Sequence, residues 1–248
     1  MKRNLLLISN STNAGEDYLF WPRQHLKSFY GSYGVKNILF IPYAGVNLSA
    51  ESVSDSFDLY EKRVAGVFSE LGFGINSIHR EGDPVEAVMK AEAIAVGGGN
   101  TFHLVMMMQA TGIMEAIRER VLGGIPYAGW SAGSNVACPT MKTTNDMPIS
   151  EPPSFNCLNL IPFQINPHYL DANPAGHAGE TREQRILEFL TVNRDIYVAG
   201  LREGCLLKVA GDTLELVGKR PMRIFRFGEE PREVNAWDEL TFLLSPEA

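Results

Sequence analysis

The sequence contains few cysteines, and it lacks both a long apolar run and an excess of positive charge. Its three cysteines, Cys138, Cys157 and Cys205, are too few and too widely spaced for a disulfide framework or a cysteine metal site. No apolar segment approaches the roughly 20 residues of a membrane-spanning helix. The formal net charge of −7 leaves no basic stripe for nucleic acid. We therefore expect a protein of the reducing cytoplasm that has neither a membrane nor a nucleic acid as its partner.

Low-complexity tracts, internal repeats and interdomain linkers are also absent from the sequence. The 248 residues are enough for one large α/β domain or two small ones, and 45% of them are apolar, an ordinary proportion for a globular protein. Because nothing in the sequence divides it, we expect residues 1–248 to form a single domain.

Short apolar runs alternate with helical patterns over most of the chain. Continuously apolar strands between helices are typical of a mostly parallel sheet covered on both faces. The final part contains strand-like runs separated by Gly- or Pro-containing turns, which indicates an antiparallel meander that closes one edge of the sheet. Strands are predicted at residues 5–8, 38–41, 75–78, 93–96, 127–130 and 196–201, the meander at 205–209, 213–217, 222–227 and 240–244, and helices at 52–71, 84–90, 102–108 and 112–121.

Residues 125–134 carry the most informative motif of the chain. A short apolar run leads directly into Gly-Trp-Ser-Ala-Gly at residues 129–133, which fits the G-x-S-x-G nucleophile elbow. Such an elbow turns so sharply from strand to helix that only small residues can flank its serine. It would present the Ser131 hydroxyl to a base and point the first amides of the next helix at an oxyanion. The motif therefore predicts Ser131 as a nucleophile.

A serine nucleophile needs a base and an orienting acid. Of the five histidines, His168 is favoured because it ends the apolar segment at residues 161–168, where the preceding Asn-Pro enforces an extended or turning backbone. The local pattern fits an ordinary polar loop residue equally well. Asp146, in the loop after the elbow helix, and Glu203, at the end of the strand predicted at residues 196–201, are both candidates for the acid. Spacing alone does not choose between these two carboxylates.

Three consecutive glycines at residues 97–99 follow another predicted strand and precede a helix. Such a run lets the backbone approach a ligand closely and exposes its amides, as in a phosphate cradle or an oxyanion hole. The phosphate interpretation is weak, because the G-x-G-x-x-G spacing and the Gly-Lys-Ser/Thr ending are both missing. With a serine elbow elsewhere in the chain, the amides of Gly99 and Ala132 are a reasonable pair of oxyanion donors.

The segment Gly-Glu-Thr-Arg-Glu-Gln-Arg at residues 179–185 predicts the start of a helix. Thr181 would be its N-cap, and Gln184, three residues later, would complete a capping box. Arg182 then lies in the first turn, where a cation opposes the helix dipole. Pairing with a neighbouring glutamate would explain this charge, and so would an anionic ligand held by the guanidinium. The residues alone favour the pairing.

Taken together, these motifs resemble those of the peptidase E family of α-aspartyl dipeptidases. The resemblance implies a flavodoxin-like, three-layer α/β fold related to class I glutamine amidotransferases, with serine in place of their catalytic cysteine. It implies a cytoplasmic enzyme, possessing no metal or other cofactor, that hydrolyses dipeptides with N-terminal aspartate, and a homodimer is a further expectation. The matching segments follow the family's order: residues 7–12 (LISNST), 40–46 (FIPYAGV), 96–102 (VGGGNTF), 129–133 (GWSAG), 143–148 (TTNDMP), 164–168 (QINPH) and 179–185 (GETREQR).

The resemblance also implies roles for the catalytic residues. Ser131 would be the nucleophile that forms an acyl-enzyme, and His168 would be its base. The third member would be either Asp146 or Glu203. We prefer Asp146, because its loop emerges from the elbow helix itself, and keep Glu203 as the alternative.

Further roles implied by the resemblance concern oxyanion and substrate binding. Gly99 and Ala132 would donate their amides to the oxyanion. Arg182 would bind the aspartyl side chain of the substrate, which reverses the preference drawn from the residues alone. Asn100 and Thr101 would also contact the substrate, a small Asp-X peptide.

Two other functions fit parts of the sequence. A cyanophycinase-like hydrolase would share the fold and the serine chemistry but would cleave β-aspartyl-arginine linkages, and the acidic net charge could suit such an arginine-rich substrate. A non-catalytic binding protein with the amidotransferase-like fold is the other alternative. The intact set of serine, histidine and acid argues against the second.

Overall fold

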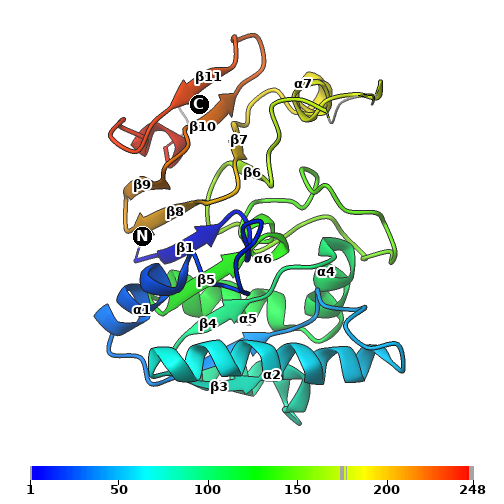
Figure 1. Cartoon of the computed structure of the whole chain (residues 1–248), viewed down its shortest axis with the longest axis vertical. Coiled ribbons are helices and arrows are strands. Elements are labelled where there is room, and N and C mark those ends of the chain that lie inside the picture. The colour runs from blue at the N-terminus through cyan, green and yellow to red at the C-terminus, as the bar shows by residue number, and fades with distance from the viewer. Residues whose placement is uncertain (1, 174–175, 177, 246–248) are drawn as a thin grey trace.

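A seven-stranded β-sheet forms the centre of the protein in the computed structural model, which describes residues 2–173, 176 and 178–245. The five strands in the order β3-β2-β4-β5-β1 are parallel, and β8 and β9 extend the sheet antiparallel beside β1 (Figure 1). The strands are β1 (Asn4–Ile8), β2 (Asn37–Ile41), β3 (Gly74–Ser77), β4 (Ile94–Val96), β5 (Pro126–Trp130), β8 (Cys205–Ala210) and β9 (Thr213–Gly218).

Helices cover both faces of this sheet because its central strands are apolar on both sides. Successive side chains of a strand point to opposite faces, so Leu5 and Leu7 pack on one side of β1 while Leu6 and Ile8 pack on the other. The face of Leu6 is covered by α1 (Arg23–Ser32) and α2 (Val53–Leu71). The face of Leu5 is covered by α3 (Pro84–Lys90), α4 (Thr101–Ala110), α5 (Ile113–Leu122) and α6 (Ala132–Asn135).

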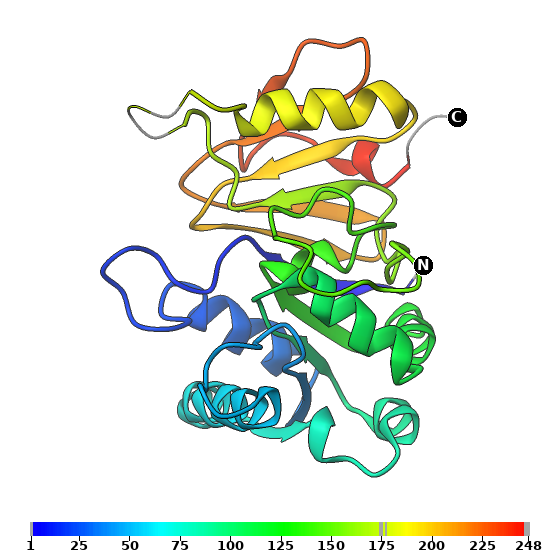
Figure 2. The ribbon, with the colours of Figure 1, turned by 90° about the vertical axis from the view of Figure 1, so that its right-hand side faces the viewer.

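A second sheet of four strands, in the order β11-β10-β7-β6, lies beyond β8 and β9 (Figure 2). Its strands β6 and β7 are parallel, and β10 pairs antiparallel with both β7 and β11. Helix α7 packs on this sheet through a small cluster that includes Ile186, Leu190, Val198 and Phe225. The elements are β6 (Gln164–Pro167), α7 (Arg182–Val192), β7 (Val198–Leu201), β10 (Met222–Phe225) and β11 (Arg232–Val234), and two short 3-10 helices lie at η1 (Ile78–Arg80) and η2 (Thr241–Leu243).

The sequence analysis predicts the α/β class, the mostly parallel sheet and the antiparallel strands near the C-terminus, and all three are confirmed. The prediction that the whole meander closes one edge of a single sheet is wrong. Only β8 and β9 join the main sheet, whereas β10 pairs with β7 in the second sheet. The strand expected at residues 240–244 is the 3-10 helix η2, and the unpredicted strand β11 completes the second sheet. Residues 1 and 246–248, the ends of the expected domain, lie outside the described residues.

The two sheets bring several chain segments to one edge of the fold. The parallel strands β1, β2, β4 and β5 end at the same edge, and ligands of open α/β sheets bind outside such carboxyl ends. Within the described part of the chain, none of the helices combines the length and the apolar character that crossing a bilayer requires.

The two glycines of the elbow pack directly against neighbouring backbone. A Cβ on Gly129 would lie 2.2 Å from the carbonyl oxygen of Gly133, and a Cβ on Gly133 would lie 2.2 Å from that of Val96. Backbone atoms cannot rotate away as a side chain can. We predict that Gly133→Ala lowers the free energy of unfolding by about 2–3 kcal/mol, measured by urea denaturation.

Gly66→Ala is the matched control for this substitution. Gly66 lies on the exposed side of α2, where an added Cβ meets nothing within 4 Å. Alanine there should leave stability unchanged or raise it by about 0.5–1 kcal/mol. A Gly133→Ala variant as stable as the wild type would contradict the close backbone contact.

Candidate active site

Ser131 occupies the sharp turn between β5 and α6. Its φ of 54° and ψ of −112° lie outside the regions that non-glycine residues usually adopt. The Ser131 N–H donates to the carbonyl of Ile8 at 3.0 Å, and the hydroxyl of Ser134 donates to the same carbonyl at 2.6 Å. The elbow is therefore held against the end of β1, and this contact keeps the serine in its strained conformation.

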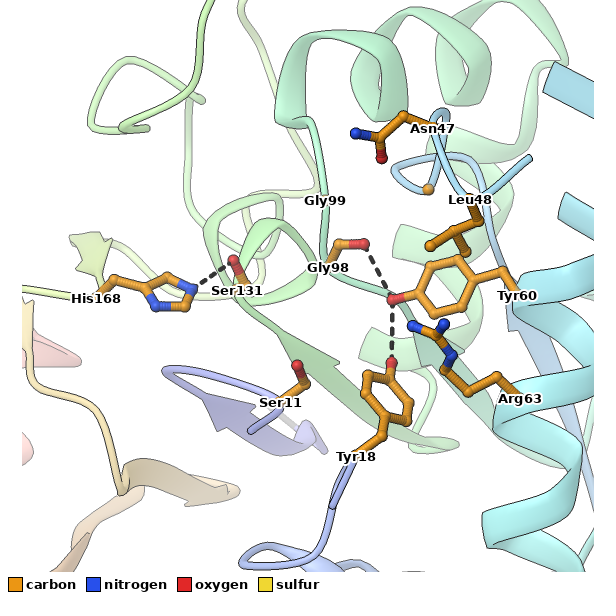
Figure 3. A pocket seen from close by; sticks show the side chains of 11 residues that line it. Ser11, Tyr18, Asn47, Leu48, Tyr60, Arg63, Gly98, Gly99, Ser131 and His168 are labelled. Carbon is orange, nitrogen blue, oxygen red and sulfur yellow. Dashed lines mark hydrogen bonds between the residues drawn. The ribbon is translucent and has the colours of Figure 1, made fainter. Parts of the chain in front are cut away.

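His168 connects Ser131 to a carboxylate. Its Nε2 lies 2.9 Å from the Ser131 hydroxyl (Figure 3), and its Nδ1 lies 2.7 Å from Oε1 of Glu203. The side chains of His168 and Glu203 are 39% and 43% exposed, so a small substrate can reach them. When Nδ1 carries the proton and donates it to Glu203, Nε2 is free to accept the serine proton. The three side chains therefore have the arrangement of a Ser-His-acid triad.

Asp146, the preferred acid of the sequence analysis, hydrogen-bonds elsewhere. Its Oδ2 accepts hydrogen bonds from the N–H of Thr101 at 2.7 Å, from the Thr101 hydroxyl at 2.6 Å and from the hydroxyl of Thr144 at 3.0 Å. Asp146 therefore binds the first turn of α4. We correct the preference accordingly: the carboxylate on His168 is that of Glu203.

The pairing of β6 with β7 explains why Glu203 is the partner. Pro167 lies opposite Leu201 in this parallel pair, so the residues that follow each strand emerge side by side. His168 directly follows β6, and Glu203 comes two residues after Leu201. The sequence contains both strands but no signal for their pairing.

Arg202 fixes the chain directly before Glu203. Its side chain is only 8% exposed, and it donates hydrogen bonds to Asp171, to Glu233 and to the carbonyl of Pro221. The two carboxylates raise the pKa of Arg202, so the guanidinium stays charged. A fully hydrogen-bonded guanidinium at this position limits the movement of the Glu203 carboxylate.

Ser9 and Asn10, directly after β1, tie the segments of the base and the acid to the main sheet. The His168 N–H donates to Oγ of Ser9 at 3.0 Å, and the Ser9 hydroxyl donates to the carbonyl of Leu201 at 2.7 Å. Oδ1 of Asn10 accepts from the N–H of Gly204 at 2.8 Å. Both side chains are buried, so these hydrogen bonds act away from competing water.

The predicted oxyanion donors are close to the nucleophile. Gly99 has a φ of +133°, and a Cβ at this position would lie 2.1 Å from the carbonyl oxygen of Ala44. A Cβ on Gly98 would lie 2.9 Å from Cβ of Ser131. The loop of residues 97–99, the glycine loop, therefore passes directly against the elbow. Within the described residues, the backbone N–H groups of Gly99 and Ala132 have no hydrogen-bond acceptor. Both amides are therefore available to an oxyanion.

Tyr60 of α2 links the glycine loop to the elbow through hydrogen bonds. Its hydroxyl donates to the carbonyl of Gly98 at 3.0 Å and accepts from Nε1 of Trp130 at 3.1 Å, while the hydroxyl of Tyr18 lies 3.2 Å away (Figure 3). Burial raises the pKa of Tyr60, so its phenol remains neutral. A Cβ on Gly97 would lie 2.6 Å from the Tyr60 hydroxyl, so a glycine fits here where a larger residue would displace the ring.

A cavity of about 330 Å³ opens beside the triad. None of the described residues that line it is acidic, and Arg63 is its permanently charged side chain. The cavity therefore suits a small ligand that carries a negative charge. The lining includes Ser131, His168, Gly99, Tyr18, Tyr60 and Arg63.

The three residues expected to bind substrate lie outside the lining of this cavity. Arg182 lines a separate cavity of about 150 Å³ together with Asn145 and Asp146. Asn100 is the N-cap of α4, and the hydroxyl of Thr101 binds Asp146. Asn100 and Thr101 therefore hold the start of α4 in place, directly after the three glycines at residues 97–99.

One group of described side chains could hold a metal ion. The ligand atoms of Asp58, Glu61 and His79 lie within 4.8 Å of one another. Arg80 already pairs with both carboxylates, at 2.9 Å and 2.5 Å, and so supplies the positive charge that a cation would bring. None of these residues lines the cavity of Ser131.

Comparison with known proteins identifies the family. The sequence profile of peptidase family S51 matches residues 5–217. The chain is 51% identical to a peptidase E of Nostoc sp. over 98% of each chain, and 47% identical to a peptidase E of Streptomyces coelicolor over 97% of this chain and 95% of that one. The chain belongs to peptidase family S51. It is accordingly a hydrolase of peptides, and the alternative of a non-catalytic binding protein is set aside.

A solved structure has a similar fold. A peptidase from an acI-B1 Actinobacterium superposes with a TM-score of 0.71, covering 97% of each chain at 20% sequence identity. At this identity the likeness shows the fold alone.

Ser9, Asn10 and Tyr60 hydrogen-bond to the segments that carry the site, but they are not among the predicted site residues. Ser9 and Asn10 carried a usable signal, because polar residues directly after a central parallel strand lie where ligands of α/β sheets bind. Tyr60 carried none, since its place on the apolar stripe of α2 is that of an ordinary core residue.

The two carboxylates can be separated by experiment in this S51 peptidase. Glu203→Gln removes the charge that stabilises the imidazolium and can turn an amide donor toward Nδ1, so labelling of Ser131 by a fluorophosphonate should slow by about 10³–10⁴-fold. Asp146→Asn keeps an oxygen that can accept from Thr101, so the labelling rate should stay within about tenfold of the wild type. Equal losses in the two variants would restore Asp146 as a candidate acid.

All three cysteines should be inert in the folded enzyme. Cys138, Cys157 and Cys205 are buried, and burial raises each thiol pKa, that of Cys138 to about 12. Because the thiolate is the reactive form, a raised pKa leaves little of it at neutral pH. Iodoacetamide should leave the native protein unmodified and fully active, and should alkylate all three thiols only in urea. Inactivation of the native protein in step with alkylation would contradict this expectation.

Proposed function

We propose that the protein is a serine dipeptidase that releases the N-terminal aspartate of Asp-X dipeptides. The observation that carries the proposal is the hydrogen-bonded series Ser131–His168–Glu203 beside the two free amides of Gly99 and Ala132. A nucleophile, a base, an orienting acid and an oxyanion hole are the parts that acyl transfer requires. The identity with proteins named peptidase E and the motif resemblance support the aspartyl substrate.

In the first half of the reaction, Oγ of Ser131 attacks the carbonyl carbon of the aspartyl residue. Nε2 of His168 accepts the hydroxyl proton as the new C–O bond forms. The amides of Gly99 and Ala132 donate hydrogen bonds to the oxyanion of the tetrahedral intermediate. His168 then donates the proton to the leaving amine, so the C–N bond breaks and an aspartyl ester remains on Ser131.

In the second half, water replaces the leaving amine. His168 accepts a proton from the water as its oxygen attacks the ester, and the same oxyanion donors bind the second intermediate. Return of the proton to Oγ of Ser131 releases free aspartate. Throughout the cycle, Glu203 accepts the Nδ1 hydrogen bond, which keeps the imidazole oriented and stabilises its charged form.

The surroundings of the triad are consistent with a short substrate. The cavity of about 330 Å³ is small for a protein ligand site and suits a dipeptide better than a polymer. On the family resemblance, we further propose that the enzyme acts as a single catalytic domain in the cytoplasm, as a homodimer and without a metal ion.

The test is steady-state hydrolysis of Asp-Leu beside Ala-Leu, Glu-Leu and β-Asp-Leu. We expect efficient cleavage of Asp-Leu alone, and a loss of about 10⁴-fold or more in kcat for Ser131→Ala. Ser69→Ala, on the exposed side of α2, removes a hydroxyl that lines no part of the cavity and should match the wild type. Cleavage of the β-linked peptide alone would move the assignment to a cyanophycinase-like hydrolase, and cleavage that survives Ser131→Ala would overturn the proposed nucleophile.

A further inference from the structure

Arg63 of α2 is a cation in the lining of the catalytic cavity. It lies three residues after Tyr60, so the two side chains share one face of the helix, and both point toward the cavity (Figure 3). Its guanidinium carbon lies 5.5 Å from the centre of the Tyr18 ring, a cation–π contact. Among the described residues, the Arg63 side chain has neither an ion pair nor a hydrogen bond. Its N–H donors are therefore available to a ligand.

The groups around Arg63 leave its charge unopposed. None of the described residues that line the cavity is acidic. Burial raises the pKa of Tyr18 and of Tyr60, so both phenols stay neutral. Their hydroxyl protons are already donated, that of Tyr18 to Tyr60 and that of Tyr60 to the carbonyl of Gly98. An anion that enters this cavity would therefore find its counter-charge in Arg63.

The position of the base places the leaving residue of a dipeptide in this cavity. The leaving amine must lie beside Nε2 of His168, because this atom donates the proton that releases it. His168 and Ser131 both line the cavity, and Arg63 lies across it from His168 (Figure 3). In a dipeptide the C-terminal carboxylate is joined to the leaving nitrogen through a single carbon atom. This carboxylate therefore lies in the same cavity as Arg63.

The other carboxylate of an Asp-X dipeptide has a different candidate partner. The family resemblance assigns the aspartyl side chain to Arg182, which lines the separate cavity of about 150 Å³. That cavity adjoins the same catalytic centre, since Asn145 in its lining donates to the carbonyl of Pro167, directly before His168, at 2.7 Å. Arg182 and Arg63 thus belong to two cavities beside the triad, and each can bind one of the two carboxylates.

We propose that Arg63 binds the C-terminal carboxylate of the leaving residue and so restricts the enzyme to dipeptides. The inference rests on the proposed function and deepens it. The planar guanidinium can donate two parallel hydrogen bonds to one carboxylate, which replaces the hydration that the carboxylate loses in the cavity. A third residue would convert this carboxylate into a neutral amide, so a longer peptide would lose the interaction with the charge of Arg63.

The test measures kcat/KM for Asp-Leu and for its C-terminal amide Asp-Leu-NH₂, which has a similar shape but no C-terminal charge. The wild type should prefer Asp-Leu by about 10- to 100-fold. Arg63→Gln should lower kcat/KM for Asp-Leu by a similar factor, chiefly through KM, because the carboxylate is bound in the ground state as well as in the transition state. The variant should then cleave the two substrates within about threefold of each other. Arg63→Lys keeps the charge without the planar fork and should recover part of the preference.

Lys62→Gln is the matched control for net charge. It removes one positive charge from the exposed side of the same helix, so it should stay within about twofold of the wild type on both substrates. Thermal unfolding of each variant establishes that the fold is intact. Because the described part of the chain shows no hydrogen bond or ion pair of Arg63, its replacement should leave Tm unchanged.

Three results would overturn the inference and leave the proposed function standing. In the first, the wild type cleaves Asp-Leu and Asp-Leu-NH₂ equally well. In the second, Arg63→Gln is as active on Asp-Leu as the wild type. In the third, Arg63→Gln loses equally on both substrates, because Arg63 would then act on a part of the substrate other than its C-terminal carboxylate. A wild type that cleaves neither peptide would contradict the proposed function and the inference together.

Discussion

The catalytic geometry depends on the hydrogen bonds of one buried hydroxyl at the end of β1. Ser131 and the glycine loop belong to the seven-stranded sheet, whereas His168 and Glu203 follow strands of the four-stranded sheet. The Ser9 hydroxyl accepts from the backbone of His168 and donates to the end of β7, and so fixes His168 and Glu203 relative to Ser131. Shifts of about an ångström between catalytic groups can reduce rates by 10²-fold, so a link between the sheets is needed for function.

Close backbone packing positions the second part of the site, the amides of Gly99 and Ala132. The loop of residues 97–99 lies against the elbow, with Tyr60 hydrogen-bonded to the carbonyl of Gly98 and to the indole of Trp130. Asp146 and Asn100 hold the first turn of α4 directly after this loop. These contacts hold the backbone around the amide of Gly99, one of the two proposed oxyanion donors, although none of these three side chains is placed in the proposed reaction itself. Preorganised donors of this kind need no rearrangement as charge develops.

The sequence predicts most of this architecture because local patterns determine most of it. The strands, the elbow and the capping box at Thr181 are each determined by short segments, and the structure contains all of them. The strand predicted at residues 75–78 is not buried as expected: β3 is a largely exposed edge strand, and Ile78 belongs to η1. The choice between Asp146 and Glu203 could not be made, because it depends on the pairing of β6 with β7. Pairing of strands that are distant in the chain leaves no local pattern. The division of the final strands between two sheets was missed for the same reason.

Ser131, His168 and Glu203 come from two sheets and meet beside a cavity with no acidic residue in its described lining. A crystal structure of the Ser131→Ala variant with bound Asp-Leu tests this arrangement most directly. We predict that the aspartyl carbonyl oxygen accepts from the amides of Gly99 and Ala132, with the leaving amide nitrogen beside His168. A dipeptide whose carbonyl lies away from these two amides, or one whose leaving group points away from His168, would contradict the account.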